Sequence, residues 1–445
     1  MGTVKSADIP RLRGISISAL WPERLLGRRP GLKEANIVCW GLFIAFLLVP
    51  ACVVFIVQAM HGSESIQRHS DFVLYYGDGT LANQYPAPKI YDPDLQHQAF
   101  LKICPDPQGA FGVSPYPPIV PYFFGLFARL PFTGAYFLWM AISLSLYCIG
   151  IRFAVMAAFP RDRLRIALLF CFALAYFPFI GSTLVNGQLS IFAVFAVGLA
   201  LYYEQSGDLF FSGLALSLLT YKPTLLLIIL PMLLLTKRFR AFVGFCAGCV
   251  AFVLLNTLLG GIKVWPAYYR LLQYHRKLTG IHGHADIKLS MYLDFSSLTH
   301  LLHGGRTPVG LIFASGISFV VGVLLARLLW RSVNGGRPVQ WLTWATTLTW
   351  TLLLNVYVPI YDSVLAVSAI ILTLGALSNL KWRCAHEWVV LLAVILLAVS
   401  WKTVSFASAH HVQLLSIALF LLGGAQLWFL HRAIRQERVE AAPSG

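Results

Sequence analysis

The stretch "VGLIFASGISFVVGVLLARLLW" (residues 309–330) holds 22 residues and a single charged side chain. An α-helix of this length spans about 33 Å, which is enough to cross the hydrocarbon core of a bilayer. Two more stretches of this kind are "IVCWGLFIAFLLVPACVVFIVQAM" (37–60) and "FVGFCAGCVAFVLLNTLL" (242–259). The pattern predicts an all-α protein that crosses the membrane many times.

The composition of the whole chain agrees with this prediction. Of its 445 residues, 58% are hydrophobic and only 12% are charged, whereas about 25% of residues are charged in an average soluble domain. This excludes a soluble globular protein. We expect about 11 to 13 transmembrane helices in a single membrane domain over residues 37–430.

The net charge of +16 would suit a nucleic-acid partner, but the placement of the charges argues against one. Basic residues gather in residues 1–36 and in short turns between apolar stretches, such as "PRDRLR" (160–165) and "TKRFR" (236–240). This is the positive-inside pattern of membrane proteins. We therefore place residues 1–36 and the tail (431–445) in the cytoplasm, and expect membrane lipids rather than nucleic acid as partners.

This orientation leaves two larger loops on the outer face, over about residues 61–117 and 260–306. The proline-rich stretch "YPPIVPYFFGLFARLP" (116–131) complicates the topology. If it crossed the membrane fully, the basic turn at 160–165 would fall on the outer face. We favour a partial helix here over a local exception to the charge rule. Since irregular backbone at membrane depth must be buried in protein or line a cavity, this segment would help to wall a site.

Polar residues recur at the outer ends of the predicted spans. A charge at a membrane boundary is costly unless it is paired or functional, so these residues are candidates for a site. Plainer interpretations stay open: Asp71 and Asp362 could cap helices. Lys222 could extend to the interface, and Gln188 could bond a neighbouring helix. The tyrosines could form an interfacial belt. The candidates are Asp71, Phe72, Tyr75, Tyr76, Tyr91, Asp92, Asn186, Gln188, Tyr221, Lys222, Tyr361 and Asp362.

The order of these features along the chain resembles glycosyltransferase family 87. An Asp-Phe pair in the first outer loop ("SDFVLYY") is followed by "KIYD", by "SPYPPIVPYFFGLFARLPF", by "NGQ" (186–188) and then by "KP" (222–223). The resemblance covers roughly residues 37–375. Its later part departs most, because the more typical Pro-His before Tyr-Asp is replaced here in "YVPIYD" (357–362).

The resemblance implies a GT-C-type fold and an inverting, metal-independent sugar transfer at the extracytoplasmic face. The donor would be a polyprenyl-phosphate sugar, with mannose as the usual sugar, and the acceptor would be a glycan, a lipid or a protein. The base implied by the family is a first-loop carboxylate, which corresponds to Asp71. The chemistry needs such a group, because an acceptor hydroxyl is a poor nucleophile until a positioned base takes its proton. The other polar and aromatic candidates would bind sugar or acceptor.

The leaving polyprenyl phosphate is an anion that cations and amides can stabilise without a metal. The stretch "WPAYYRLLQYHRKL" (265–278) predicts an amphipathic helix, either for lipid capture or as a plain surface helix. Lys222 could instead hold a neighbouring helix. In "GIHGHAD" (280–286) two histidines and one acid are weak evidence for zinc, so we expect no metal and no cofactor besides the donor. The phosphate candidates are Lys222, Arg270, His275, Arg276, Lys277 and Arg306.

Two other kinds of function stay open. A secondary transporter for an anionic or lipidic solute would need no catalytic base, and a lipid-linked glycan polymerase or ligase would handle similar lipids. The asymmetric outer loops and the absence of an internal repeat count against a transporter, and the acidic first-loop motif favours transfer of single sugars. The chain has no Asn-x-Ser/Thr sequon, which suits a bacterial inner membrane with the site on the periplasmic face.

Overall fold

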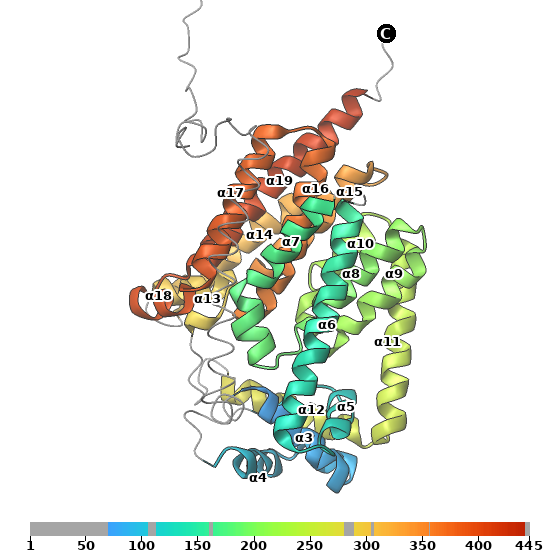
Figure 1. Cartoon of the computed structure of the whole chain (residues 1–445), viewed down its shortest axis with the longest axis vertical. Coiled ribbons are helices and arrows are strands. Elements are labelled where there is room, and N and C mark those ends of the chain that lie inside the picture. Colours follow the sequence, from blue (N-terminus) through green and yellow to red (C-terminus); the bar gives the residue numbers. More distant parts are fainter. Residues whose placement is uncertain are drawn as a thin grey trace, which may run out of the picture.

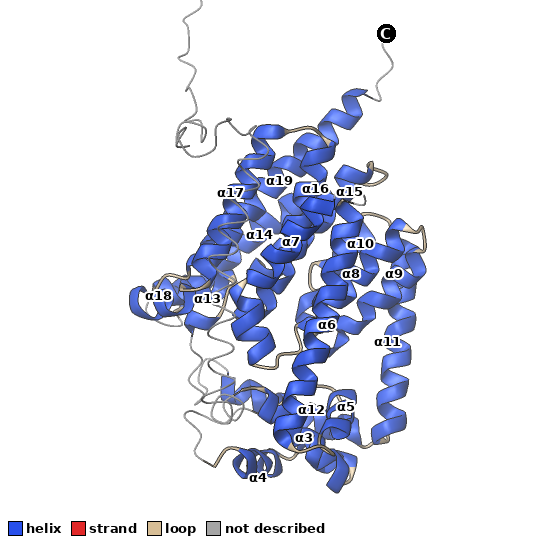
Figure 2. Cartoon of the chain, viewed as in Figure 1, coloured by secondary structure: helices blue, strands red, loops and turns tan. Residues whose placement is uncertain are grey.

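The computed structural model describes residues 70–105, 113–159, 163–279, 289–303, 307–355 and 357–440. Within these ranges the secondary structure is helical, apart from one isolated antiparallel bridge between Tyr292 and Pro359 (Figure 2). Four predicted features lie outside the described residues: the basic segment 1–36, the apolar stretch 37–60, Arg306 and the histidines of 280–286.

Six described helices are long and apolar enough to cross a membrane. They are α6 (Phe132–Ala158), α11 (Phe239–Gly260), α14 (Pro308–Arg331), Ile360–Asn379 (η7 with α16), α17 (Arg383–Ser400) and α19 (Leu414–Glu440). A seventh span would be α7 (Arg163–Ala175) with η3 (Pro178–Val185), which bend by 60° at their junction. These helices confirm an all-α polytopic membrane protein. The total of 11 to 13 transmembrane helices stays a prediction. Three further apolar helices follow η3, but each is shorter than 18 residues and is not counted as a span.

The proline-rich stretch forms a short helix, α5 (Ile119–Phe127), of nine residues. At 1.5 Å per residue it is about 14 Å long, which is too short to cross the hydrocarbon core. The chain then enters α6. At the far end of α6, the Gln205 side-chain amide donates to the Ala157 carbonyl at 2.6 Å. Glu204, beside Gln205, pairs with Arg238 of the basic 236–240 turn at 2.7 Å. The expected partial helix is present, and α6 ends on the same side of the molecule as that basic turn.

Helices from the two predicted outer loops gather at one end of the molecule (Figure 1). They are α3 (Phe72–Gln84), α4 (Pro93–Ile103) and α12 (Val264–Thr279), which lie there with α5, while α19 ends at the opposite end. α12 is amphipathic as predicted: Val264, Ala267 and Leu271 are buried in a small apolar cluster with residues of α3 and of the following 3-10 turn η2 (Ala87–Tyr91). The chain therefore places a small cap of loop helices over one end of the membrane bundle.

The helix α16 (Leu365–Asn379) forms the centre of the bundle, since its residues from Leu365 to Leu377 are all buried. It packs against α15 (Arg337–Leu353), α6 and α17. α11 and α14 are peripheral and expose large apolar side chains, such as Leu258 (82%) and Phe319 (73%), as lipid-facing helices do.

Glycines let two of the inner helices approach closely. A Cβ on Gly198 of α8 (Ile191–Gln205) would lie 2.3 Å from the Gly150 carbonyl oxygen of α6. Small residues allow such backbone contact between membrane helices. This contact fixes α8 against α6, and the turn that precedes α8 carries the residues described next.

Candidate functional site

The Asp71 carboxylate is bound by two amide side chains from a distant part of the chain. Asp71 directly precedes α3, but its side chain makes no capping bond to that helix. Asn186 Nδ2 donates to Asp71 Oδ2 at 2.8 Å, and Gln188 Nε2 donates to the same oxygen. The Asp71 backbone amide donates to Asn186 Oδ1 at 3.0 Å. Asp71 therefore belongs to a built polar site rather than to a helix cap.

Gly187 brings the two amides to α3. Its φ of 73° lies in the left-handed region that favours glycine. A Cβ at this position would lie 2.8 Å from the Cβ of Phe72. Trp139 of α6 donates its indole N–H to the Gly187 carbonyl at 2.8 Å. The turn follows η3, a π-helix, and such helices are frequent at functional sites. Asn-Gly-Gln thus forms a tight turn whose two amides face the carboxylate.

The surroundings of Asp71 shift the pKa of its carboxyl toward neutral pH. Burial raises the pKa of the Asp71 carboxyl to about 6, while the bonds from Asn186 and Gln188 and the charge of Lys222 limit this rise. The group is therefore mostly ionised at pH 7 and can accept a proton. A base with a pKa near the working pH is well matched to general base catalysis.

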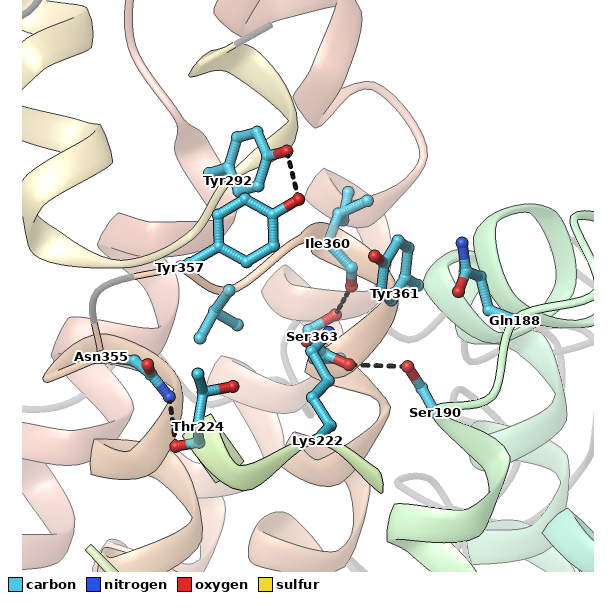
Figure 3. Close-up of polar contacts among 12 residues, drawn as sticks. Gln188, Ser190, Lys222, Thr224, Tyr292, Asn355, Tyr357, Ile360, Tyr361 and Ser363 are labelled. Atoms are coloured by element: carbon cyan, nitrogen blue, oxygen red, sulfur yellow. Dashed lines mark hydrogen bonds and ion pairs between the residues drawn. The ribbon is translucent and has the colours of Figure 1, made fainter. Parts of the chain in front are cut away.

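The second charged feature is an ion pair between Lys222 and Asp362. Lys222 Nζ bonds to Asp362 Oδ2, and the Ser190 hydroxyl donates to Oδ1 at 2.6 Å. The two charged side chains are 12% and 0% exposed. The ammonium also lies 4.7 Å from the centre of the Tyr361 ring. Figure 3 shows Lys222 rising from a broken helix toward the segment that carries Tyr361 and Ser363. The lysine charge is thus compensated by a buried acid.

A break in the helix presents Lys222 to this pair. The residue stands between two 3-10 turns, η4 (Ser217–Tyr221) and η5 (Pro223–Leu226), with φ −138° and ψ 78°. Pro223 has no N–H to continue a helix. The chain therefore leaves the helical path at Lys222, which allows its side chain to reach Asp362 at the start of the span Ile360–Asn379.

Tyrosines lie between Asp71 and the ion pair. The Tyr75 hydroxyl donates to Gln188 Oε1 at 2.9 Å and lies 3.4 Å from the Tyr116 hydroxyl. The Tyr116 ring faces that of Tyr221, with centres 6.4 Å apart and planes at 24°. Tyr221 in turn precedes Lys222. This row of rings joins the two charged features into one polar site.

Four residues of this site were missed by sequence reasoning. Tyr116 stands in the quoted "YPP" stretch and Tyr357 in "YVPIYD", so a signal for both was present. Tyr292, whose hydroxyl donates to that of Tyr357 at 3.0 Å (Figure 3), and Ser190 had none. Their role comes from partners far away in the chain, which no local pattern indicates.

Several predicted site residues have other partners. Phe72 is fully buried in an aromatic cluster. Asp92 caps α4, because its side chain accepts from the first amides of that helix. Tyr76 and Tyr91 donate to backbone carbonyls at 2.8 and 3.0 Å. The α12 candidates lie on an exposed or half-buried face of that helix and are Arg270, His275, Arg276 and Lys277.

A second buried acid in α3, Asp78, has a different environment and gives a stability prediction. It is 3% exposed, and burial raises the pKa of its carboxyl to about 8. Between about pH 4 and 8 the folded state therefore binds more protons at this group than the unfolded state. The free energy of unfolding then falls as pH rises, by up to about 1.4 kcal/mol per pH unit.

We expect Asp78→Asn, which cannot ionise, to weaken this pH dependence. Thermal unfolding of both proteins in detergent between pH 5 and 8 measures the effect. The wild-type Tm should fall more steeply with pH than that of the variant, so that the variant gains stability relative to wild type at pH 8. Parallel curves would contradict a neutral, buried Asp78.

Comparison with known proteins supports the resemblance. The model of glycosyltransferase family 87 matches residues 115–355, which is more than half of the chain and includes Asn186, Gln188 and Lys222. Searches of curated proteins and of solved structures gave no match. Together with the six apolar helices of membrane-spanning length, this establishes that the chain belongs to glycosyltransferase family 87 and is a membrane glycosyltransferase.

Proposed function

We propose that this enzyme transfers a sugar, with mannose as the first choice, from a polyprenyl-phosphate donor to an acceptor hydroxyl. The transfer would invert the anomeric carbon and need no metal, and Asp71 would be the general base. One observation supports this most: two amides hold the Asp71 carboxylate at the end where the loop helices gather, with a pKa of about 6.

The proposed step balances as a single displacement. The acceptor O–H bond breaks as its oxygen forms a bond to the anomeric carbon, and the proton goes to Asp71. The bond from the anomeric carbon to the phosphate oxygen breaks, and its electron pair leaves with polyprenyl phosphate. A carboxylate that is ionised at neutral pH and held in place suits the first half of this step.

Cations near the leaving group would stabilise the developing phosphate charge. Lys222 is close enough to Asp71 to lower the pKa of that carboxyl, so it is a candidate for this role if the donor phosphate can share it with Asp362. The residues Val264–Thr279 of α12 contain no acid and follow the end of α11 closely. A basic helix in this position suits capture of an anionic lipid head group at the membrane surface.

The remaining polar residues would bind the sugars. Tyr116, Tyr221 and Tyr361 offer ring faces and hydroxyls near both charged features. Aromatic rings have apolar faces and polar tips that suit sugar rings. We place the site on the periplasmic side of an inner membrane, because α11 begins in the basic 236–240 turn and runs from there to the end where the loop helices lie (Figure 1).

Release of polyprenyl phosphate tests the proposal. Purified protein in lipid nanodiscs would receive radiolabelled polyprenyl-phosphate mannose, with and without a membrane lipid extract as acceptor, and with EDTA present. We expect release that depends on the acceptor and survives EDTA. Release that EDTA abolishes would contradict metal independence. No release with any acceptor would contradict this donor, and ion-coupled uptake of a lipidic solute would favour a transporter.

A further inference from the structure

The two oxygens of the Asp71 carboxylate have different surroundings. Oδ2 accepts hydrogen bonds from both Asn186 Nδ2 and Gln188 Nε2. In the part of the chain that the structure describes, no donor is bonded to Oδ1. Two donors on one oxygen stabilise negative charge there and occupy its lone pairs. Among the described residues, Oδ1 is therefore the oxygen whose lone pairs are open.

The orientation of each amide is fixed by a different residue. An amide can present either its oxygen or its nitrogen to a neighbour, and only the nitrogen bonds to a carboxylate. For Asn186 the choice is set by Asp71 itself, because the Asp71 backbone N–H donates to Asn186 Oδ1. For Gln188 the choice depends on a third residue, because its Oε1 accepts from the Tyr75 hydroxyl at 2.9 Å.

The Tyr75 ring is held firmly enough to serve as this anchor. It is buried, it stacks on Phe124 with ring centres 5.2 Å apart, and the Tyr116 ring meets it edge-on at 5.5 Å. Asp71 and Tyr75 are also four residues apart at the start of α3, so they share one face of that helix. One helical turn thus carries both the carboxylate and the hydroxyl that orients its partner.

We propose that Tyr75 is a positioning residue that locks the Gln188 amide, keeps Oδ2 occupied and leaves Oδ1 as the atom that takes the acceptor proton. This inference rests on the proposed role of Asp71 as the base. Without the Tyr75 hydroxyl, the Gln188 amide is free to turn, and its oxygen would then face the carboxylate and disfavour the charged form.

Other groups also act on Asp71 and must stay unchanged in a test. Lys222 lowers the pKa of the Asp71 carboxyl and is paired with Asp362. Five tyrosines from four segments of the chain interact electrostatically with the Asp71 carboxylate. They are Tyr75, Tyr116, Tyr292, Tyr357 and Tyr361. Tyr75→Phe removes one hydroxyl and leaves the charged pair and the other four hydroxyls in place.

The first experiment measures the protonation of Asp71 and needs no sugar donor. Carbodiimide labels protonated carboxyls, so the pH dependence of Asp71 labelling, measured by peptide mass spectrometry, gives its titration midpoint. We expect Tyr75→Phe to raise this midpoint by about one pH unit. In a Gln188→Ala background the same change should give no further shift, because the amide that it orients is gone.

The control is Tyr147→Phe, which also removes a buried hydroxyl bond, here to the Ala173 carbonyl within the bundle. It should leave the midpoint unchanged even if it lowers Tm. An unchanged midpoint in Tyr75→Phe would overturn the inference. So would an equal shift in the presence and absence of Gln188, since the effect would then not pass through the amide.

The second experiment adds catalysis. With saturating polyprenyl-phosphate mannose, Tyr75→Phe should lower the release rate at pH 6 by about fivefold and move the acid limb of the pH profile upward, with KM for the donor unchanged. An unmoved acid limb in an active variant would overturn the inference. If the wild type released nothing, the proposed donor would fail while the labelling midpoint still decided the role of Tyr75.

Discussion

Asp71→Asn is expected to lower the rate of sugar transfer by about 10³-fold, the middle of the range for loss of a general base. The asparagine oxygen can still accept from the amides of Asn186 and Gln188, so the turn at Gly187 should keep its position. What the variant loses is the ability to take the acceptor proton. Donor binding should therefore persist while polyprenyl phosphate release is lost, which the nanodisc assay measures directly.

Asp78→Asn is the matched control for this prediction. It makes the same chemical change at an acid seven residues further on, inside α3, that is buried and mostly protonated at neutral pH. We expect this variant to keep its transfer activity at pH 7. Comparable turnover by Asp71→Asn would refute the base assignment. Equal losses in both variants would point to a general effect of changes in α3.

The fold class could be predicted from the sequence because it depends on local composition. Apolar stretches such as residues 309–330 must be helical and long if they face lipid, since the backbone has no other hydrogen-bond partner there. The partial helix at 116–131 was also predictable, from its prolines and from the charge of the turn that follows α6. Helix count was harder, because apolar stretches that end in 3-10 turns, as at Tyr221 and Pro223, look like full spans.

The members of the site could be predicted better than their contacts. Asp71, Gln188 and Lys222 stood out because polar residues at the ends of apolar stretches are costly. Their pairing could not be deduced, because it joins residues 117 positions apart for Asp71 and Gln188 and 140 apart for Lys222 and Asp362. The notion that Lys222 could hold a neighbouring helix agrees with its bond to Asp362, at the start of a different span.

This ion pair leads to the second large effect, on stability. Lys222→Ala would leave the Asp362 carboxylate, whose side chain is fully buried, without its cation. Removing one partner of a buried pair costs about 3–5 kcal/mol, because the other charge stays desolvated. We expect a loss of this size in equilibrium unfolding in mixed detergent micelles. Lys102→Ala, at an exposed position of α4, should change the free energy of unfolding by less than about 0.5 kcal/mol.

The double variant Lys222→Met with Asp362→Asn separates the two roles of the lysine. It removes both charges, so it should recover most of the stability that Lys222→Ala loses. A double variant as unstable as the single one would show that packing, not the charge pair, holds these segments together. If the stable double variant also binds the donor and transfers sugar at the wild-type rate, Lys222 serves only to hold two segments of the bundle together. If it folds but releases polyprenyl phosphate slowly, the Lys222 ammonium has a second role in stabilising the leaving phosphate. Asp362 and the donor phosphate must then share this ammonium.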